Sequence, residues 1–374
     1  MRIAMIRPVR DPVRLETYNI QEIGLAKSLL NMGVSTDIFI QINTRKNTFV
    51  EFEKKMGNLI RIYSLAGVPL FGRNEYYPQL FKILCSNGYD FIQSLDDNML
   101  MSVLIITWAK KNGIKTILRQ GMYECFTGYK KVIQKIYDFH FQGLLKKSVD
   151  LAIAKTNTAA DYLEAKGFKN IHVLPVGLDF REFERRESVR DGNLEEFKNK
   201  NSKILLYVGK IERRRQVDFL IRVLNEIREQ INTGLVIVGD GPERSRMEEI
   251  VVELDLADRV LFTGKVPQTR LSSIYNLADV FLLASRYEIV GMVVLEALYH
   301  GLPVISTRTG GPLDILKKEH LGCCVDKNVT IWSQVIMDAF DNECEKHRIR
   351  RKQYIREKYD WNKLARRYLD IIGE

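Results

Sequence analysis

The sequence predicts an α/β protein with two doubly wound domains, and three observations support this. Short runs rich in Val, Ile and Leu recur along the 374 residues, and amphipathic stretches of helical length separate them. The series stops once, in a polar segment near the middle of the chain, and then starts again. Continuous apolar strands that alternate with helices are typical of parallel sheets covered on both faces. The length suits two such domains.

The first series predicts a Rossmann-like domain over residues 1–183. A helical pattern between Tyr18 and Asn31 follows the first strand. We expect strands at 2–6, 35–40, 59–65, 90–95, 114–118 and 151–154.

The second series predicts another Rossmann-like domain over residues 184–345. We expect its strands at 203–209, 235–239, 259–264, 280–285 and 303–307. The remaining residues, 346–374, have the pattern of a single helix. Trp361, Leu364, Tyr368 and Ile371 fall on one stripe of that helix.

Composition and charge restrict the class of protein. Hydrophobic residues make up 45% and charged residues 28%, which is normal for a soluble globular chain. Its five cysteines have no metal-ligand spacing and suit a reducing cytoplasm, and no run of residues has the length of a membrane span or the pattern of a signal peptide. The formal net charge of +10 predicts an anionic partner, such as a phosphorylated ligand or an acidic membrane, and a solvated basic surface is the alternative. No nucleic-acid motif is present, so nucleic acid is not an expected partner.

A basic loop follows the first strand of the second domain. In VGKIERRRQVD (208–218), Gly209 is followed by Lys210 and, later, by Arg215. Glycine allows close approach of a ligand to the backbone, and the cations suit a phosphate. An exposed basic turn is the alternative. The next loop, VGDGPE (238–243), does not fit the dinucleotide GxGxxG pattern and indicates only a turn.

Two further loops lead into helices. SRYEIVGMVVLEALYHGLPVISTRTGG (285–311) starts one helix near Gly291 and Met292 and another near Gly310. The free N–H groups at helix N-termini bind anions, so these loops predict a diphosphate pocket together with the basic loop.

Two glutamates of this stretch are candidates for donor binding. Glu296 is flanked by apolar residues, where a carboxylate is costly without a partner. It lies about a turn and a half into the helix, roughly 7–8 Å along the axis, which suits contact with a ribose diol beyond the diphosphate. An arginine partner for Glu296 is the alternative. For Glu288, the alternative is a favourable charge near the helix dipole.

In order and spacing, these motifs resemble the donor domain of the retaining glycosyltransferase family four, which has the GT-B fold. The resemblance is strong from about residue 171 onward and weaker before it. It implies two Rossmann-like domains that face each other across a cleft, with the C-terminal helix returning to the N-terminal domain. The segments that carry it are VLPVGLDFREF, LLYVGKIERRRQVDFLI, LVIVGDGPER, VLFTGKVP, LADVFLLASRYEIVGMVVLEALYHGLPVISTRTGG and YDWNKLARRYL.

The resemblance also implies roles for individual residues. Lys210 and Arg215 match the family's diphosphate clamp with the two cation types exchanged, and Gln216 stands where a glycine is usual. Val266 would lie near the nucleobase. The implied catalytic residues are Glu288, Lys210 and Arg215, and the implied donor-binding residues are Gly209, Val266, Gly291, Met292, Glu296 and Gly310.

The implied activity is that of a hexosyltransferase. A sugar would move from a nucleotide diphosphate, with UDP expected first, to a hydroxyl of a cell-surface glycan precursor that is lipid-linked. The anomeric configuration would be retained, and no metal or other cofactor would be required. The alternatives are a non-catalytic GT-B partner subunit or glycan-binding protein, and a sugar-nucleotide epimerase.

The first domain is expected to receive the acceptor. The loop after the first strand carries Arg7 and Arg10, which suit an anionic acceptor or a solvated loop equally. Asp96 and Asp97 follow a strand and belong either to a strand-end turn or to a metal pair. Gln120 stands where the resemblance places a histidine, and its amide can bond a sugar hydroxyl but cannot carry a proton at neutral pH.

Residues 128–150 combine lysines with large apolar side chains. This pattern suits a segment that rests on an anionic membrane, with the protein peripheral on the inner face of the plasma membrane. A core-packing helix pair with a wet lysine face is the alternative.

Overall fold

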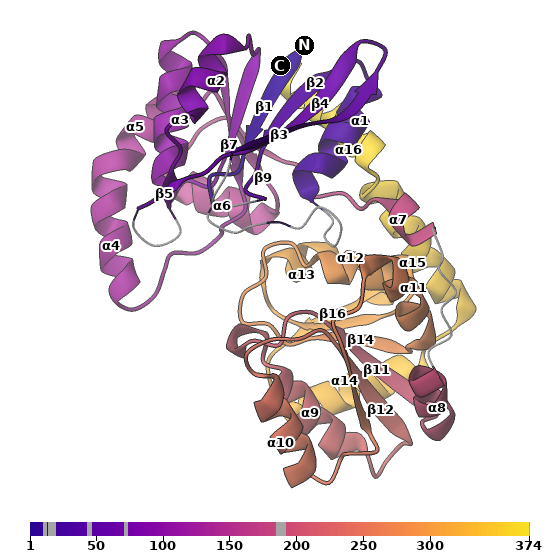
Figure 1. Ribbon diagram of the computed structural model, residues 1–374. Coiled ribbons are helices and arrows are strands. Elements are labelled where there is room, and N and C mark those ends of the chain that lie inside the picture. Colours follow the sequence, from indigo (N-terminus) through magenta and orange to yellow (C-terminus); the bar gives the residue numbers. More distant parts are fainter. Residues whose placement is uncertain (10–12, 14–19, 43–46, 71–73, 185–191, 374) are drawn as a thin grey trace. The chain divides into compact units, whose positions relative to one another are not determined.

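The computed structural model describes residues 1–9, 13, 20–42, 47–70, 74–184 and 192–373, and these residues form two compact units (Figure 1). The first unit consists of Met1–Gly177 with Trp361–Glu374, and the second of Leu178–Asp360. No helix in the described ranges has the length and apolar character that spanning a bilayer requires.

The first unit is built on an eight-stranded sheet with the order β10-β9-β8-β7-β1-β2-β4-β3, in which β3 alone is antiparallel to its neighbour. Its strands are β1 (Arg2–Ile6), β2 (Ser35–Phe39), β3 (Thr48–Lys55), β4 (Asn58–Ser64), β7 (Phe91–Leu95), β8 (Lys115–Gln120), β9 (Leu151–Ala154) and β10 (Ile171–Val173), and β5 (Val68–Pro69) pairs with β6 (Glu75–Tyr76). Its helices are α1 (Gln21–Leu30), α2 (Leu80–Ser86), α3 (Leu100–Lys111), α4 (Tyr129–Tyr137), the π-helical η1 (Asp138–Gln142), α5 (Gly143–Ser148), α6 (Asn157–Ala165) and α16 (Trp361–Gly373).

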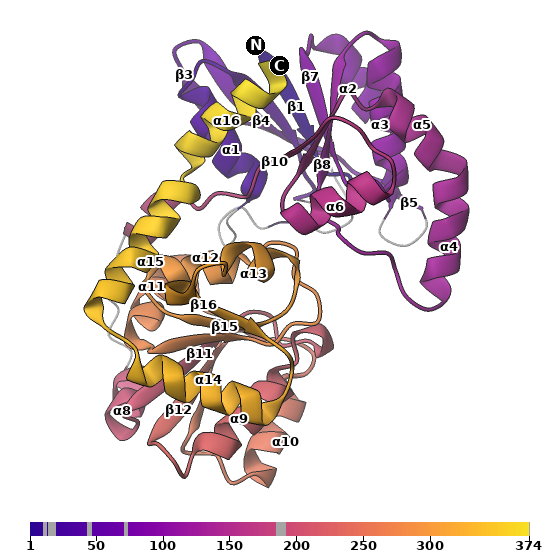
Figure 2. The same ribbon diagram turned by 180° about the vertical axis from the view of Figure 1, so that it is seen from behind.

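Helices cover both faces of this sheet. Helices α1 and α16 pack against each other on one face, and α2, α3, α5 and α6 contribute to the cores on the other (Figures 1 and 2). Since parallel strands are covered on both sides, the apolar residues of β1 are almost all buried.

The second unit is built on a six-stranded parallel sheet with the order β13-β12-β11-β14-β15-β16. Its strands are β11 (Lys203–Val208), β12 (Thr233–Val238), β13 (Val260–Gly264), β14 (Val280–Leu283), β15 (Val304–Thr307) and β16 (Gly322–Val325). Its helices are α7 (Phe180–Glu184), α8 (Gly192–Lys200), η2 (Arg213–Arg215), α9 (Val217–Ile227), α10 (Arg244–Glu253), α11 (Gln268–Leu277), α12 (Met292–Tyr299), α13 (Gly310–Ile315), η3 (Glu319–Leu321), α14 (Val329–Asp341) and α15 (Glu345–Lys358). The strand order reverses between β11 and β14, and this reversal creates a crevice at their carboxyl ends.

The predicted fold class is confirmed, because both units are doubly wound sheets. The expected strands are present, with bounds shifted by at most a few residues. The sequence does not predict the two-residue strands β5 and β6, which are too short to leave a pattern. It also does not predict β3, β10 and β16, which lie at sheet edges, where lower burial leaves a weaker apolar signal.

The predicted single helix over 346–374 is wrong, because the chain forms α15 and α16 with a break between them. At the break, Tyr359 O accepts a hydrogen bond from Leu178 N at 2.8 Å, and Asp360 forms a parallel bridge with Leu178. This pairing draws the backbone out of the helix. The units accordingly divide at 177/178 and 360/361, whereas the boundaries expected from sequence stand at 183/184 and 345/346.

Helix α16 joins the first unit through Trp361, which is 6% exposed. Its indole lies between two glycines of the same unit, Gly24 in α1 and Gly177. A methyl group on Gly24 would lie 2.3 Å from Trp361 Nε1, and one on Gly177 would lie 2.5 Å from Trp361 Cδ2. The glycines therefore make the space that the ring occupies. The rest of the predicted stripe, Leu364, Tyr368 and Ile371, is buried as expected.

Gly24→Ala should therefore destabilise the first unit. The added methyl group overpacks the indole, which typically costs about 1–3 kcal/mol. This corresponds to a drop in Tm of roughly 2–4 °C for each kcal/mol in a unit of this size. Calorimetric unfolding measures the change. Gly143→Ala is the matched control, since nothing lies within 4 Å of the added methyl group, and equal Tm values for the two variants would contradict the account.

Candidate functional site

The candidate site lies at the carboxyl edge of the second unit's sheet, where the strand order reverses. Strands β11 and β14 pair there through Leu205 with Val280 and Leu206 with Phe281. The loop after β11 contains Gly209 and the short helix η2, and the loop after β14 leads into α12. Ligands of open α/β sheets bind at such a reversal.

An ion pair joins these two loops. Arg215, the last residue of η2, donates through Nη1 to the carboxylate of Glu288 and to Ser285 Oγ at 3.1 Å. Both charged side chains are largely buried, with 18% and 13% of their areas exposed. Burial lowers the pKa of Arg215, but Glu288, Tyr207 and Glu212 together outweigh this and raise the pKa above its ordinary value. Arg215 Nε is buried and has no hydrogen-bond partner within the described residues.

Gln216 follows Arg215 and turns the chain from η2 into α9. It has a left-handed conformation with a φ of 53°, which is uncommon for a residue with a side chain. With its amide oriented to match its neighbours, Nε2 donates to Ala284 O at 3.1 Å, and Oε1 accepts from Lys327 Nζ at 2.8 Å and Arg286 Nε at 2.9 Å. These contacts tie η2 to the end of β14. They show how glutamine fills a position where the resemblance expects glycine.

The loops before α12 and α13 lie against each other. Gly311 N donates to Glu288 O at 3.2 Å, and Thr307 Oγ1 donates to Ser285 O at 2.6 Å. A side chain on Gly311 would place Cβ 2.1 Å from Val290 O, so only glycine permits this approach. Gly291 caps α12 with a φ of 75°, directly before Met292, and Gly310 begins α13. The predicted helix N-termini are therefore brought together.

Glu296 is 6% exposed and pairs with a tyrosine rather than an arginine. Its Oε2 accepts a hydrogen bond from Tyr275 Oη of α11 at 2.8 Å. The Tyr275 ring in turn stacks on His300, with ring centroids 4.9 Å apart. Burial raises the pKa of the Glu296 carboxyl to about 7, although the tyrosine hydrogen bond lowers it in part. The carboxyl group therefore changes charge near neutral pH.

Two predicted donor-side residues stand apart from the ion pair. Lys210 has 64% of its side chain exposed and contacts Glu212 at 3.5 Å, while its carbonyl accepts from Tyr207 Oη at 3.0 Å. Val266 follows β13 and lines a cavity of about 190 Å³. The other lining residues of this cavity come from α8, β13, the loop after β13 and α11, and include Phe262, Lys265 and Arg270.

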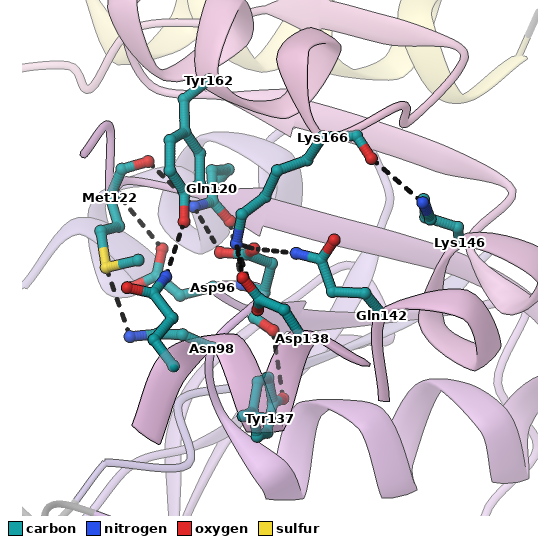
Figure 3. Close-up of polar contacts among 12 residues, drawn as sticks. Asp96, Asn98, Gln120, Met122, Tyr137, Asp138, Gln142, Lys146, Tyr162 and Lys166 are labelled. Atoms are coloured by element: carbon teal, nitrogen blue, oxygen red, sulfur yellow. Dashed lines mark hydrogen bonds and ion pairs between the residues drawn. The ribbon is translucent and has the colours of Figure 1, made fainter. Parts of the chain in front are cut away.

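On the first unit, Asp96 organises the loop after β8 (Figure 3). Its backbone has a φ of 51°, and its Oδ1 accepts from Gly121 N at 2.7 Å and Met122 N at 3.3 Å. This geometry fits the strand-end turn that the sequence allows.

Gln120 is fully buried and bound on both sides of its amide. Its Oε1 accepts from Asp97 N at 3.0 Å, and its Nε2 donates to Asp97 Oδ1 at 3.0 Å and to Met122 O at 2.9 Å. The side chain that stands in for the family's histidine is therefore occupied within the first unit.

Asp97, also fully buried, is the centre of this polar cluster. Its Oδ2 accepts from Lys166 Nζ at 2.6 Å and from Gln142 Nε2 at 3.0 Å. Burial raises the pKa of Asp97 despite the opposing charge of Lys166. Asp138 gives Lys166 a second carboxylate at 3.2 Å. Removal of one member would leave a buried charge without its partner, so the cluster is a structural unit.

Three sequence predictions remain, namely Arg7, Arg10 and the metal pair of Asp96 and Asp97. Arg7 follows β1, and its N–H donates to Phe39 O at 2.9 Å, while Arg10 lies outside the described residues. Across the described ranges, no group of three or more His, Cys, Asp or Glu side chains has the geometry to hold a metal ion.

Sequence reasoning missed Ser285 and Tyr275. Ser285 had a signal, since it ends the apolar strand expected at 280–285, at the edge where the other candidates meet. Tyr275 had none, because its contact with Glu296 depends on how α11 packs against α12.

Comparisons with known proteins match the second unit by sequence. Residues 193–358 match the model of the family described as glycosyl transferases group 1. A similar curated protein is an uncharacterized glycosyltransferase of Methanocaldococcus jannaschii, 31% identical over 46% of this chain and 45% of its own. Another is the alpha-monoglucosyldiacylglycerol synthase of Streptococcus pneumoniae, 32% identical over 36% of this chain and 32% of its own. The chain thus spans less than half the length of these relatives.

The solved structures match the whole chain by fold. The crystal structure of Anabaena HepE in complex with UDP superposes with a TM-score of 0.73 at 14% identity, covering 100% of both chains. This likeness and the two Rossmann-like sheets establish the GT-B fold class. Within this GT-B fold, residues 193–358 are similar to the family described as glycosyl transferases group 1.

Proposed function

We propose that this protein is a retaining glycosyltransferase. It transfers a hexose from a nucleotide diphosphate to a hydroxyl of a lipid-linked precursor of a cell-surface glycan. UDP is the nucleotide that we propose first. The observation that carries the proposal is the meeting of Arg215 and Glu288 at the strand reversal of the second unit, beside the N-termini of α12 and α13. That UDP occupies a structure of the same fold supports the choice of nucleotide.

Arg215 has the position and charge to stabilise the departing diphosphate. Its Nη1 stays on Glu288 and Ser285, which fixes the direction of the guanidinium. Lys210, exposed in the same loop, adds a second cation. A preorganised donor matters most where negative charge develops in the transition state, and the two helix N-termini add to this field. We propose that no metal is needed.

The two glutamates bind the sugar and the ribose of the donor. Glu288 accepts hydrogen bonds from hydroxyls of the sugar, and Glu296 accepts them from the ribose. Tyr275 binds Glu296 Oε2 and holds the carboxylate in place. Val266 lies near the nucleobase. Because Glu296 is buried, its ionised form gains more from ribose hydroxyls than an exposed carboxylate would.

The acceptor meets the first unit, and the location is the cytoplasmic face of the plasma membrane. The name of the pneumococcal relative, a synthase of a glycosylated diacylglycerol, supports a lipid acceptor. The loop that Asp96 organises and the basic residue Arg7 both follow strands at the carboxyl edge of the first sheet.

A thermal-shift screen with UDP, GDP and ADP, each without metal, tests the donor pocket. Ligand at about 100 times its Kd adds roughly 2.7 kcal/mol to the folded state, or a few degrees in Tm. A shift with UDP is expected. No shift with any nucleotide, in folded protein, would favour a non-catalytic partner subunit instead.

Arg215→Ala should lower kcat by roughly 10²–10³-fold, since it removes one preorganised donor to the leaving group. Arg246→Ala, on the exposed side of α10, is the matched control and should leave kcat unchanged. Turnover of a sugar nucleotide by steady-state kinetics measures both. Near-normal kcat in the Arg215 variant would refute the diphosphate assignment.

Glu296→Gln should affect the free energy of unfolding and the affinity for UDP in opposite directions. The folded-state pKa of about 7 lies above the ordinary 4.5, so between these values the folded chain holds a proton that the unfolded chain has lost. The free energy of unfolding therefore falls as pH rises through this window, by an amount on the order of 3 kcal/mol. The variant should lose this slope and be more stable than wild type at pH 8.

The same variant should bind UDP at least tenfold more weakly at pH 8, because two ribose hydroxyls lose a charged acceptor. In wild type, UDP affinity should increase as pH rises through 7. Chemical denaturation and calorimetric titration measure the two effects. Glu249→Gln, on exposed α10, is the control, and unchanged UDP affinity in the Glu296 variant would remove its ribose role.

A further inference from the structure

Helix α4 of the first unit buries a polar side chain and exposes apolar side chains to solvent. Its one buried side chain is Gln134, and its apolar side chains between Tyr129 and Ile136 face outward, whereas Tyr137 at its end packs on the core. Tyr129 is 74% exposed, Val132 60% and Ile136 57%, and Phe139 in the adjoining η1 is 85% exposed. The spacing of 129, 132, 133 and 136 places these side chains on one stripe. Helices of globular proteins normally bury such a stripe, so a partner for it is missing.

Polar contacts hold this helix on the body of the unit. Gln134 accepts from Phe126 N at 2.7 Å and donates to Tyr162 Oη at 3.2 Å. Tyr137 Oη donates to Asp97 O at 3.1 Å, and Gln142 at the end of η1 donates to Asp97 Oδ2 (Figure 3). The buried cluster around Asp97 fixes the helix by its polar side. This attachment keeps the apolar stripe directed outward.

The charges around the stripe are almost all positive. Between residues 128 and 149 the chain has five lysines and one acidic residue, Asp138. The carboxylate of Asp138 is already engaged by Lys166 at 3.2 Å. Lys130, Lys131 and Lys135 lie on α4 and are exposed, and Lys146 and Lys147 lie on α5. Figures 1 and 2 both place α4 at the periphery of the unit, beyond α3 and α5.

From this arrangement we propose that α4, η1 and α5 (Tyr129–Ser148) form a docking surface for an anionic membrane. The apolar stripe enters the boundary between headgroups and acyl chains, and the lysines contact acidic lipid headgroups. The segment lies on the surface and does not cross the bilayer. The surface deepens the proposed function, on which it rests for the lipid-linked acceptor, but lipid binding is measured without sugar transfer, so either proposal can fail alone.

Charge favours a membrane over a second copy of this chain. Two copies that met through this stripe would bring ten lysines together with only two aspartates to offset them. An acidic lipid surface instead complements every lysine and also covers the apolar side chains. The earlier alternative, a core-packing helix pair, holds for α5, where Leu145 is buried in the core, but not for the exposed stripe of α4.

Co-sedimentation of the full chain with vesicles tests the surface. Phosphatidylcholine vesicles with added phosphatidylglycerol should bind the protein at low salt, and pure phosphatidylcholine should bind it weakly. The double variant Ile136→Ser with Phe139→Ser should lower the affinity more than about tenfold, because two apolar side chains no longer leave water. Lys130→Ala with Lys131→Ala should lower it by roughly 30-fold.

Matched controls come from exposed sites elsewhere. Val252→Ser on α10 removes a side chain that is 74% exposed, and Lys54→Ala on β3 removes an exposed lysine. Both should bind vesicles as wild type does. All the substituted positions are exposed, so the variants should fold, and thermal unfolding checks this.

Three results would overturn the proposal. One is failure of folded wild type to bind anionic vesicles at low salt. Another is equal loss of binding in the control variants. A third is a dimer, detected by light scattering, that the Ile136 and Phe139 double variant dissociates, since the stripe would then be an interface between copies. If vesicle binding fails while UDP still shifts the Tm, the donor site stands and only the surface is lost.

Discussion

The contact of Arg215 with Glu288 and Ser285 is the interaction around which the second unit's site is organised. It joins the loop after β11 to the loop after β14 across the reversal of strand order. Gln216 secures the same junction from the other side through Ala284, at the end of β14. An arginine placed so close to a carboxylate keeps its charge and its direction, even though burial alone would weaken the charged form. A ligand would then find the guanidinium already oriented, which is the condition under which such a group contributes most to a charged transition state.

The first unit has a comparable centre, but with a different purpose. The buried Asp97 binds Gln120, Gln142 and Lys166, and each of these groups has a polar partner in the cluster. Buried polar networks of this type set local geometry rather than add stability. Here the network fixes a strand end, a loop and an outward-facing helix to one another. Asp97 and Gln120 are completely buried, whereas the arginine and glutamate of the second unit keep 18% and 13% of their side-chain areas exposed.

The sequence predicted the fold class, the interior strands and the loops of the candidate site, because each depends on local patterns. Apolar runs are long where a strand is buried on both faces, and glycine marks positions such as Gly291, where the backbone requires a positive φ. The sequence did not predict the contacts between these elements. Nothing in the sequence indicates that Tyr275 meets Glu296, or that Leu178 pairs with the backbone at Tyr359 and divides the last helix in two. The outward direction of the α4 stripe was equally hidden, since a periodic apolar pattern is the same whether it faces a core or an outside partner.

The division of the chain has a consequence for how the protein is made. The second unit is continuous in sequence, whereas the first needs Trp361 to enter the space between Gly24 and Gly177. During synthesis from the N-terminus, the sheets of both units leave the ribosome well before α16 does. The second unit can therefore complete its contacts while the first still exposes the groove for the indole. Until the last helix arrives, α1 has an uncovered apolar face, and this is the period in which the nascent chain is most exposed to misassociation and to chaperone binding.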